Sequence, residues 1–188
     1  RMDPSQGETA ASLVARISEG DLAELFRLLG EEPRAGAIAR AIVRARDRAP
    51  LTTTGQLAEV VAAASRWTNS RRHPATRVFQ ALRMAVNDEI GALHAALEDG
   101  LARLGPDGRM AVITFESLTD REVKNGFGAH VGRLLSLPQG GVRREGREPA
   151  VAWVHRHPVT ASEAEVAANP RARSAKLRAV RRLTRAEE

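Results

Sequence analysis

The stretch HPATRVFQALRMAVNDEIGALHAALEDGLARLGPDG, residues 73–108, decides the fold that this sequence predicts. Its large apolar residues recur every three or four positions, which is the period of one face of a helix. They are Val78, Leu82, Val86, Ile90, Leu93, Leu97, Leu101 and Leu104. Pro74 suits a helix start, because the first turn does not use the N–H that proline lacks. Residues 105–108 (GPDG) are a turn that ends a helix. The pattern therefore predicts a single long helix.

A short apolar run, RMAVITF at residues 109–115, follows the turn and is typical of a buried strand. A long helix, a turn and a buried strand make half of a βαβ unit. Glu116 and Ser117 come directly after the strand. Because ligands of open α/β sheets bind beyond the carboxyl ends of the strands, both are weak candidates for catalytic residues. A strand-to-helix turn with exposed polar residues explains them equally well.

The part of the chain after this strand mixes helix, loop and strand signals. Thr119 and Glu122 form a capping box that predicts a helix with an apolar face running to Leu135. Residues 136–149 are rich in Gly, Pro and Arg and are expected to be a loop. Alternation over residues 151–155 predicts a strand. Periodicity leaves residues 175–183 as either a helix or an edge strand.

Residues 9–64 predict four short helices that form a compact helical subdomain. Ser18 and the pair Thr53 and Gln56 are N-terminal capping signals, and Gly30 is placed to end the second helix. The third helix carries Arg40, Arg44 and Arg48 along one face, either as a solvated face or as a ridge that contacts phosphates. A basic linker with Trp67 follows over residues 65–72.

Composition indicates a globular chain with a polyanionic partner. The 188 residues carry a net charge of +6 and contain no cysteine, which excludes disulfides and thiol chemistry and is compatible with the cytoplasm. Of the 29 basic residues only Lys124 and Lys176 are lysines, and arginine suits bidentate phosphate contacts, although biased coding composition explains it too. No apolar run is long enough to span a membrane. The histidine spacing predicts no metal site.

Several motifs resemble the bacterial ribosomal RNA small-subunit methyltransferase H family (MraW/RsmH). HPATRVFQALRMAVNDE at residues 73–89 is similar to its signature, and NPRARSAKLR at residues 169–178 is similar to its closing motif. Residues 39–44 and 53–60 resemble its inserted helical domain, and residues 107–115 resemble its fifth strand. The resemblance implies an enzyme that uses S-adenosylmethionine to methylate N4 of a cytidine in the decoding region of 16S rRNA.

The resemblance also implies an α/β fold, namely the C-terminal part of a Rossmann-like class I methyltransferase sheet with an inserted small all-helical domain. Residues 1–8 would end one segment of the methyltransferase core, 9–72 would be the inserted substrate-recognition domain, and 73–188 the C-terminal half of the core. The family's glycine-rich cofactor loop, its ribose-binding acidic residue and its catalytic strand motif all precede the matching segment. No cofactor-binding residue is therefore assigned in this chain, which is expected to be inactive alone.

Two further expectations concern particular residues. Residues 175–182 would be the last strand, paired beside the strand at 150–155. Glu116 stands where the family usually has a histidine, so the role of that histidine does not carry over.

The expected partner is 16S rRNA in the small ribosomal subunit, with no membrane and with possible self-association through an exposed sheet edge. The RNA-binding candidates are Arg40, Arg44, Arg71, Arg72, His73, Arg77, Arg121, Lys124, Asn169, Arg171, Arg173 and Lys176. The alternative to an enzyme part is a stand-alone RNA-binding module or remnant without catalysis.

Overall fold

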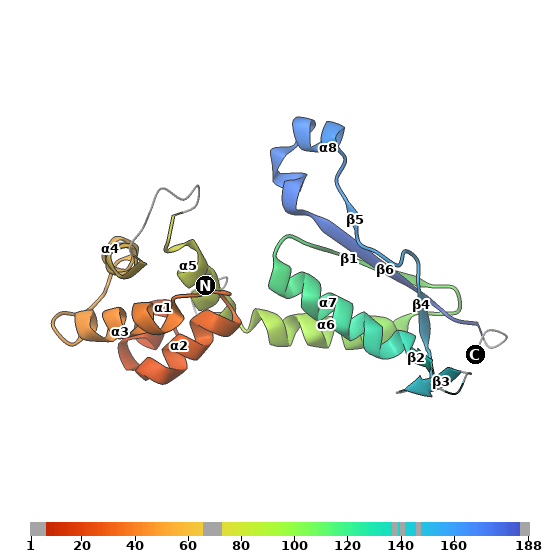
Figure 1. Cartoon of the computed structure of the whole chain (residues 1–188), viewed down its shortest axis with the longest axis horizontal. Helices are drawn as coiled ribbons and strands as arrows, with labels where there is room; N and C mark the ends of the chain where they lie inside the picture. The colour runs from red at the N-terminus through yellow and green to blue at the C-terminus, as the bar shows by residue number, and fades with distance from the viewer. Residues whose placement is uncertain (1–6, 66–72, 137–138, 140–141, 146–147, 185–188) are drawn as a thin grey trace. The chain divides into compact units, whose positions relative to one another are not determined.

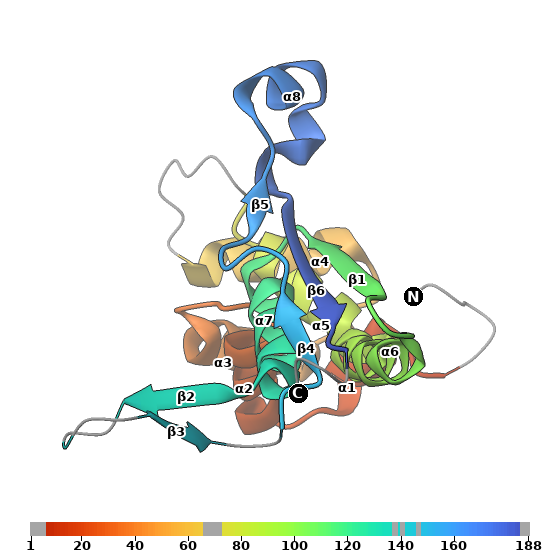
Figure 2. The same ribbon diagram turned by 90° about the vertical axis from the view of Figure 1, so that its right-hand side faces the viewer.

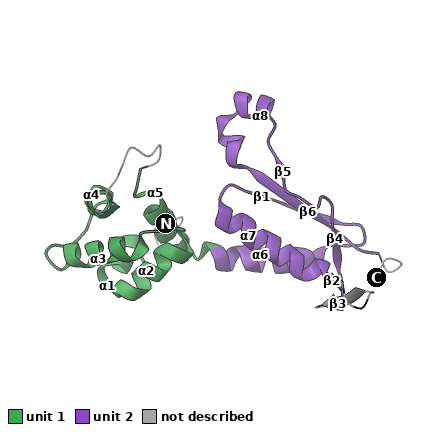
Figure 3. Ribbon diagram, in the orientation of Figure 1, with its two compact units in different colours: residues 1–89 green, residues 90–188 purple. Residues whose placement is uncertain are grey.

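The chain folds into two compact units, residues 1–89 and residues 90–188 (Figure 3). The computed structural model describes residues 7–65, 73–136, 139, 142–145 and 148–184. The first unit holds five helices over its described residues: α1 (Ala10–Arg16), α2 (Glu19–Leu28), α3 (Ala35–Arg46), α4 (Thr54–Ser65) and α5 (Thr76–Val86). The helical cluster expected from the sequence is present, and α5 packs on it as a further member.

The first unit closes around one apolar core. Its almost wholly buried side chains include Phe26 of α2, Ile38 and Ile42 of α3, Val61 of α4 and Leu82 of α5. α3 packs against both α2 and α4, and α2 also packs against α5. Burial of side chains of this size contributes about 1.5–3 kcal/mol each, so packing rather than helix propensity holds these short helices.

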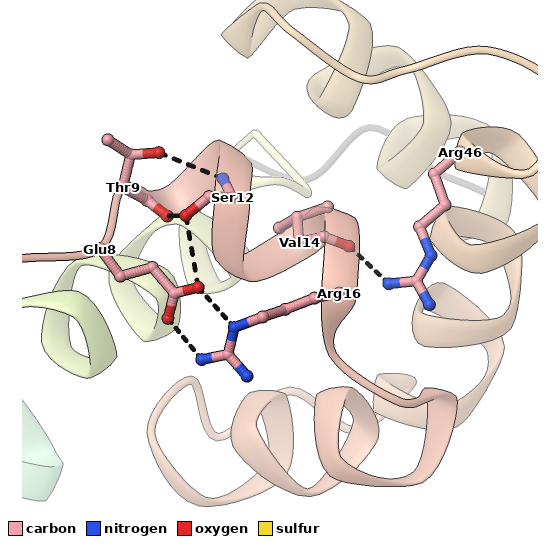
Figure 4. Close-up of polar contacts among 6 residues, drawn as sticks. All are labelled: Glu8, Thr9, Ser12, Val14, Arg16 and Arg46. Carbon is pink, nitrogen blue, oxygen red and sulfur yellow. Dashed lines mark hydrogen bonds and ion pairs between the residues drawn. The ribbon is translucent and has the colours of Figure 1, made fainter.

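Side-chain caps begin the helices where the sequence predicts them. The Ser18 hydroxyl accepts a hydrogen bond from the Asp21 N–H at 3.1 Å. Thr53 Oγ1 accepts from the Gln56 N–H at 3.2 Å, while Gln56 Oε1 accepts from the Thr53 N–H at 3.0 Å. Both capping signals are thus confirmed. At α1, Thr9 caps the helix and the Arg16 guanidinium donates two 2.6 Å hydrogen bonds to the Glu8 carboxylate (Figure 4).

Gly30 follows the end of α2 as predicted. A glycine is needed at this position because of close packing and not because of its backbone conformation. The residue with positive φ is the next one, Glu31, at 48°. A Cβ at Gly30 would lie 2.7 Å from the Arg77 carbonyl oxygen of α5 and 2.8 Å from that of Phe26. The missing side chain therefore lets the end of α2 approach the backbone of α5.

The prediction of one long helix over residues 73–108 is wrong. α5 ends at Val86 and α6 (Glu89–Arg103) begins after Asp88, whose φ of 46° no α-helix contains. The Asn87 side chain caps the end of α5 by donating to the Arg83 carbonyl at 2.8 Å. The apolar stripe continues across the break, but its two halves belong to different cores, with Leu82 in the first unit and Leu97 in the second.

The second unit packs two helices on one face of a small antiparallel sheet (Figures 1 and 2). After α6 its elements are β1 (Arg109–Thr114), α7 (Ser117–Val131), β2 (Arg133–Ser136), β3 (Val142–Glu145), β4 (Val151–Trp153), β5 (Val159–Thr160), α8 (Glu163–Ala168), the 3₁₀ helix η1 (Pro170–Ser174) and β6 (Lys176–Arg182). The main sheet has the order β1-β6-β4, and β5 also pairs with β6. The core between this sheet and the helices consists of Leu97, Leu101, Val123, Phe127, Val151 and Val180.

Strand β6 is the centre of the described sheet, not an edge. Val151 pairs with Arg182 and Trp153 with Val180, which confirms the pairing expected between residues 175–182 and 150–155. On its other side β6 pairs with β1, from Thr114 opposite Lys176 to Arg109 opposite Arg181. Every pairing among the described strands is antiparallel. The parallel partner expected for β1 is therefore not among them, and the Rossmann-like arrangement stays a prediction.

Three local predictions in this unit are wrong. β1 was expected to be a buried strand, but one of its faces is only partly buried, through Met110, Val112 and Thr114, and the other is exposed, with Ile113 56% exposed. α7 begins at Ser117 instead of after Thr119, whose hydroxyl donates to the Glu116 carbonyl at 3.1 Å. Leu134 and Leu135 lie in β2, which forms a hairpin with β3 where a helix end and a loop were expected. Gly132, with φ of 73°, separates α7 from β2.

Candidate nucleic-acid interface

Glu116 and Ser117 form the turn between β1 and α7, at the carboxyl end of β1. Glu116 is half-buried, and its carbonyl oxygen accepts from the Asp120 N–H at 3.0 Å, which starts the helix. Ser117 is exposed as the first residue of α7. The location expected from the sequence is thus correct for both residues, while their catalytic role remains a prediction.

Asp120 joins α7 to β6 through an ion-pair cluster in which it and Arg178 are buried and Lys176 is partly exposed. Its carboxylate accepts from Arg178 Nε at 2.7 Å and Nη2 at 3.1 Å, and from Lys176 Nζ at 3.3 Å. The Arg178 guanidinium is the main cause of the lowered pKa of Asp120, and Lys176 adds to it against the opposing effect of burial. Sequence reasoning missed Asp120 and Arg178, because no local spacing links residues 58 positions apart.

Lys176 is a candidate that the structure places beside the end of β1. It pairs with Thr114, and Thr114 Oγ1 donates to its carbonyl oxygen at 3.5 Å. Its side chain remains 41% exposed, although it contacts Asp120. A partly exposed ammonium group therefore lies beside the β1 end.

The other candidates of the second unit lie on α7 and around η1. Arg121 and Lys124 are exposed on α7, and Arg171 and Arg173 are exposed on η1, which leads directly into β6. Asn169 has a structural explanation, because its side chain accepts from the Arg171 N–H at 3.2 Å and caps η1. The closing motif thus holds Arg171 and Arg173 on a capped turn that precedes Lys176.

The described candidates of the first unit make different contacts. Arg40 pairs with Glu19 of α2 at 3.2 Å, whereas Arg44 is exposed on the side of α3 that faces α4. Arg77 is exposed on α5, and His73 Nδ1 accepts from the Ala75 N–H at 3.2 Å just before that helix. Arg71 and Arg72 lie outside the described residues.

A groove of about 560 Å³ runs between α3 and α4. It is lined by Arg34, Ala37, Ala41, Arg44, Ala45, Arg48, Val60, Ala63 and Ala64. Arg34, which sequence reasoning also missed, donates from Nη1 to the Ser65 carbonyl at the end of α4 at 2.6 Å.

Two classes of site are not found in the part of the chain that the structure describes. No three His, Asp or Glu side chains gather there as ligands for a metal ion. None of its helices combines the length and the apolar character that crossing a membrane requires.

Known proteins match this chain over nearly its whole length. It is 51% identical to the ribosomal RNA small subunit methyltransferase H of Syntrophotalea carbinolica over 97% of this chain and 59% of that protein. The protein of the same name from Methylobacterium sp. (strain 4-46) is 53% identical over 92% of this chain and 52% of its own length. The one from Symbiobacterium thermophilum is 50% identical over 100% of this chain and 60% of its own length.

The chain thus spans between about half and three fifths of the length of these curated relatives. A family model described as the MraW methylase family matches residues 1–183. The signature that opens α5 and the closing motif that forms η1 and β6 both lie within that match. The chain therefore belongs to the MraW methylase family.

Proposed function

We propose that this chain is the C-terminal portion of an S-adenosylmethionine-dependent methyltransferase that methylates N4 of a cytidine in the decoding region of 16S rRNA. The observation that carries the proposal is identity of about 50% across almost the whole chain to proteins named ribosomal RNA small subunit methyltransferase H. The partner is then the small ribosomal subunit, and the location is the cytoplasm.

The turn after β1 does not fit a cofactor cradle. The turn after β1 consists of Phe115 and Glu116. It has no glycine that would bring backbone N–H groups close to a ligand. We therefore assign the cofactor site to a part of the enzyme outside this chain, and we expect the chain alone to be inactive.

The contribution of this chain is to hold the RNA. The N4 amine of cytosine is a weak nucleophile, because its lone pair is delocalised into the ring, so orientation matters more to its reaction than a strong base does. Cationic groups lie in and just before β6: Lys176 pairs with Thr114 at the end of β1, and Arg171 and Arg173 lie on η1, which precedes that strand. Glu116 and Ser117 lie at that end and are the residues of this chain that we place nearest to the reacting base.

The test is methylation of 16S rRNA by a chimera in a bacterial strain that lacks its own methyltransferase H. The chimera joins the N-terminal part of the Syntrophotalea carbinolica relative, up to the first matched residue, to this chain. We expect mass spectrometry of the rRNA to detect N4-methylated cytidine with the chimera, and none with this chain alone.

The controls separate an enzyme part from a binding module. The intact relative has to restore the modification, and the purified chimera has to show a cooperative thermal transition. A folded chimera that binds rRNA but leaves cytidine unmodified would contradict the proposal. It would favour the alternative of an RNA-binding module without catalysis.

A further inference from the structure

The groove between α3 and α4 combines three cationic side chains with an apolar floor. Its other lining residues are five alanines and Val60, so every charged residue in the lining is an arginine. Arg44 and Arg48 are exposed and form no ion pair with an acidic group among the described residues. Their positive charge is therefore available to a ligand.

The arginines in and beside α3 contact different neighbouring helices. Arg40 is directed to Glu19 of α2, and Arg46 donates to the Val14 carbonyl of α1 at 2.5 Å (Figure 4). Arg44 of α3, Arg34 just before that helix and Arg48 just after it all line the groove on the α4 side. The groove is thus lined by the arginines in and beside α3 that make no contact with α1 or α2 in the described structure.

We propose that this groove binds a single-stranded segment of RNA, with Arg44 and Arg48 on its phosphates and the alanine floor against an unstacked base or ribose. The inference rests on the proposed function for the nature of the ligand. Charge complementarity favours a polyanion, because no acidic residue opposes the arginines of the lining. The floor favours a single strand, because in a duplex the bases are stacked and cannot lie on it.

Arg34 has a different part in the groove. Its hydrogen bond to the Ser65 carbonyl ties the start of α3 to the end of α4, so it sets the distance between the two walls. We therefore leave Arg34 unchanged in the test, since its replacement would alter the groove itself.

The experiment measures binding of a fluorescein-labelled single-stranded RNA decamer to the 188-residue chain by anisotropy, across a series of salt concentrations. The test variant is Arg44→Ala with Arg48→Ala. Each phosphate contact to a single strand contributes about 0.7 to the slope of log Kd against log salt. Loss of both contacts should lower the slope by about 1.4 and weaken binding about 25-fold at 0.1 M salt.

Two further variants locate the effect. Arg27→Ala removes an exposed arginine of α2 that does not line the groove, and it should leave the slope unchanged. Ala37→Leu fills part of the groove without a change of charge and should weaken binding at an unchanged slope. Circular dichroism verifies that each variant is folded.

The inference is overturned if Arg27→Ala, which removes one charge, lowers the slope by half as much as the double variant does, because the effect would then be that of net charge. Unaltered binding in the double variant or in Ala37→Leu would also overturn it. Displacement of the RNA by hexaglutamate at equal charge concentration would identify an acidic peptide as the ligand instead. Because this readout is binding, a chimera that fails to methylate while the groove still binds RNA would contradict only the proposed function.

Discussion

At the scale of single residues, Asp120 has the largest predicted effect on stability. Asp120→Asn leaves the guanidinium of Arg178 buried without its carboxylate partner, which should cost the second unit about 3 kcal/mol. Asp107→Asn is the matched control, because its ion pair with Arg181 at 2.6 Å is exposed and should contribute less than about 1 kcal/mol. Urea unfolding followed by Trp153 fluorescence measures both in a Trp67→Phe background.

The same carboxylate predicts a dependence on pH. The pKa of Asp120 is lower in the folded chain than its ordinary value of about 3.9, because Arg178 and Lys176 stabilise the charged form. The Asp120 carboxylate therefore makes its full contribution to the free energy of unfolding at neutral pH. That contribution is lost as the pH falls below the ordinary value and then through the lower pKa of the folded chain. The difference in unfolding free energy between the wild type and Asp120→Asn should shrink on acidification below pH 4, and a constant difference would contradict this account.

At the scale of elements, Gly30 and Gly36 should respond to alanine in opposite directions. Gly30→Ala forces α2 away from the Arg77 carbonyl of α5 and should destabilise the first unit by about 1–3 kcal/mol. At Gly36, in the first turn of α3, a Cβ meets nothing within 4 Å, so alanine should stabilise by about 0.5 kcal/mol. Hydrogen exchange of the α2 and α3 amides measures both changes. If Gly30→Ala left the stability unchanged, α2 would be able to shift away from α5 at little cost in free energy.

At the scale of the whole molecule, strand β1 should promote self-association. Among the described strands it pairs with β6 alone, and the side chains of Ile113 and, just beyond it, Phe115 are 56% and 58% exposed. An open strand edge beside apolar side chains is a template for pairing with another chain.

Sedimentation velocity over a concentration series tests this prediction. The average mass should rise with concentration, and Ile113→Lys with Phe115→Ser should suppress the rise. Leu28→Lys is the control, because Leu28 is 55% exposed on α2, far from β1 in the sequence and in the other compact unit. If both variants suppressed the rise in mass equally, the association would depend on exposed apolar side chains in general and not on the edge of β1.

Local signals were enough to predict much of the first unit and the position of the candidate site. The caps at Ser18 and Thr53 depend on contacts three residues apart, which a sequence displays directly. Placing Glu116 and Ser117 needed only the end of an apolar run and the start of a helix. The resemblance supplied the pairing of β6 with β4, which periodicity left open.

The amino-acid sequence by itself thus determined the helical cluster, the family and the basic character of the chain, because periodicity, capping and motifs are properties of neighbouring residues. Only the tertiary structure decided that the apolar stripe of residues 73–108 serves two cores and breaks at Asp88. Only the tertiary structure showed that Arg40 forms an ion pair with Glu19, whereas Arg44 lines the groove between α3 and α4. The physical reason is that the partner of a side chain across the fold lies many residues away, and neither periodicity nor capping encodes such a distance.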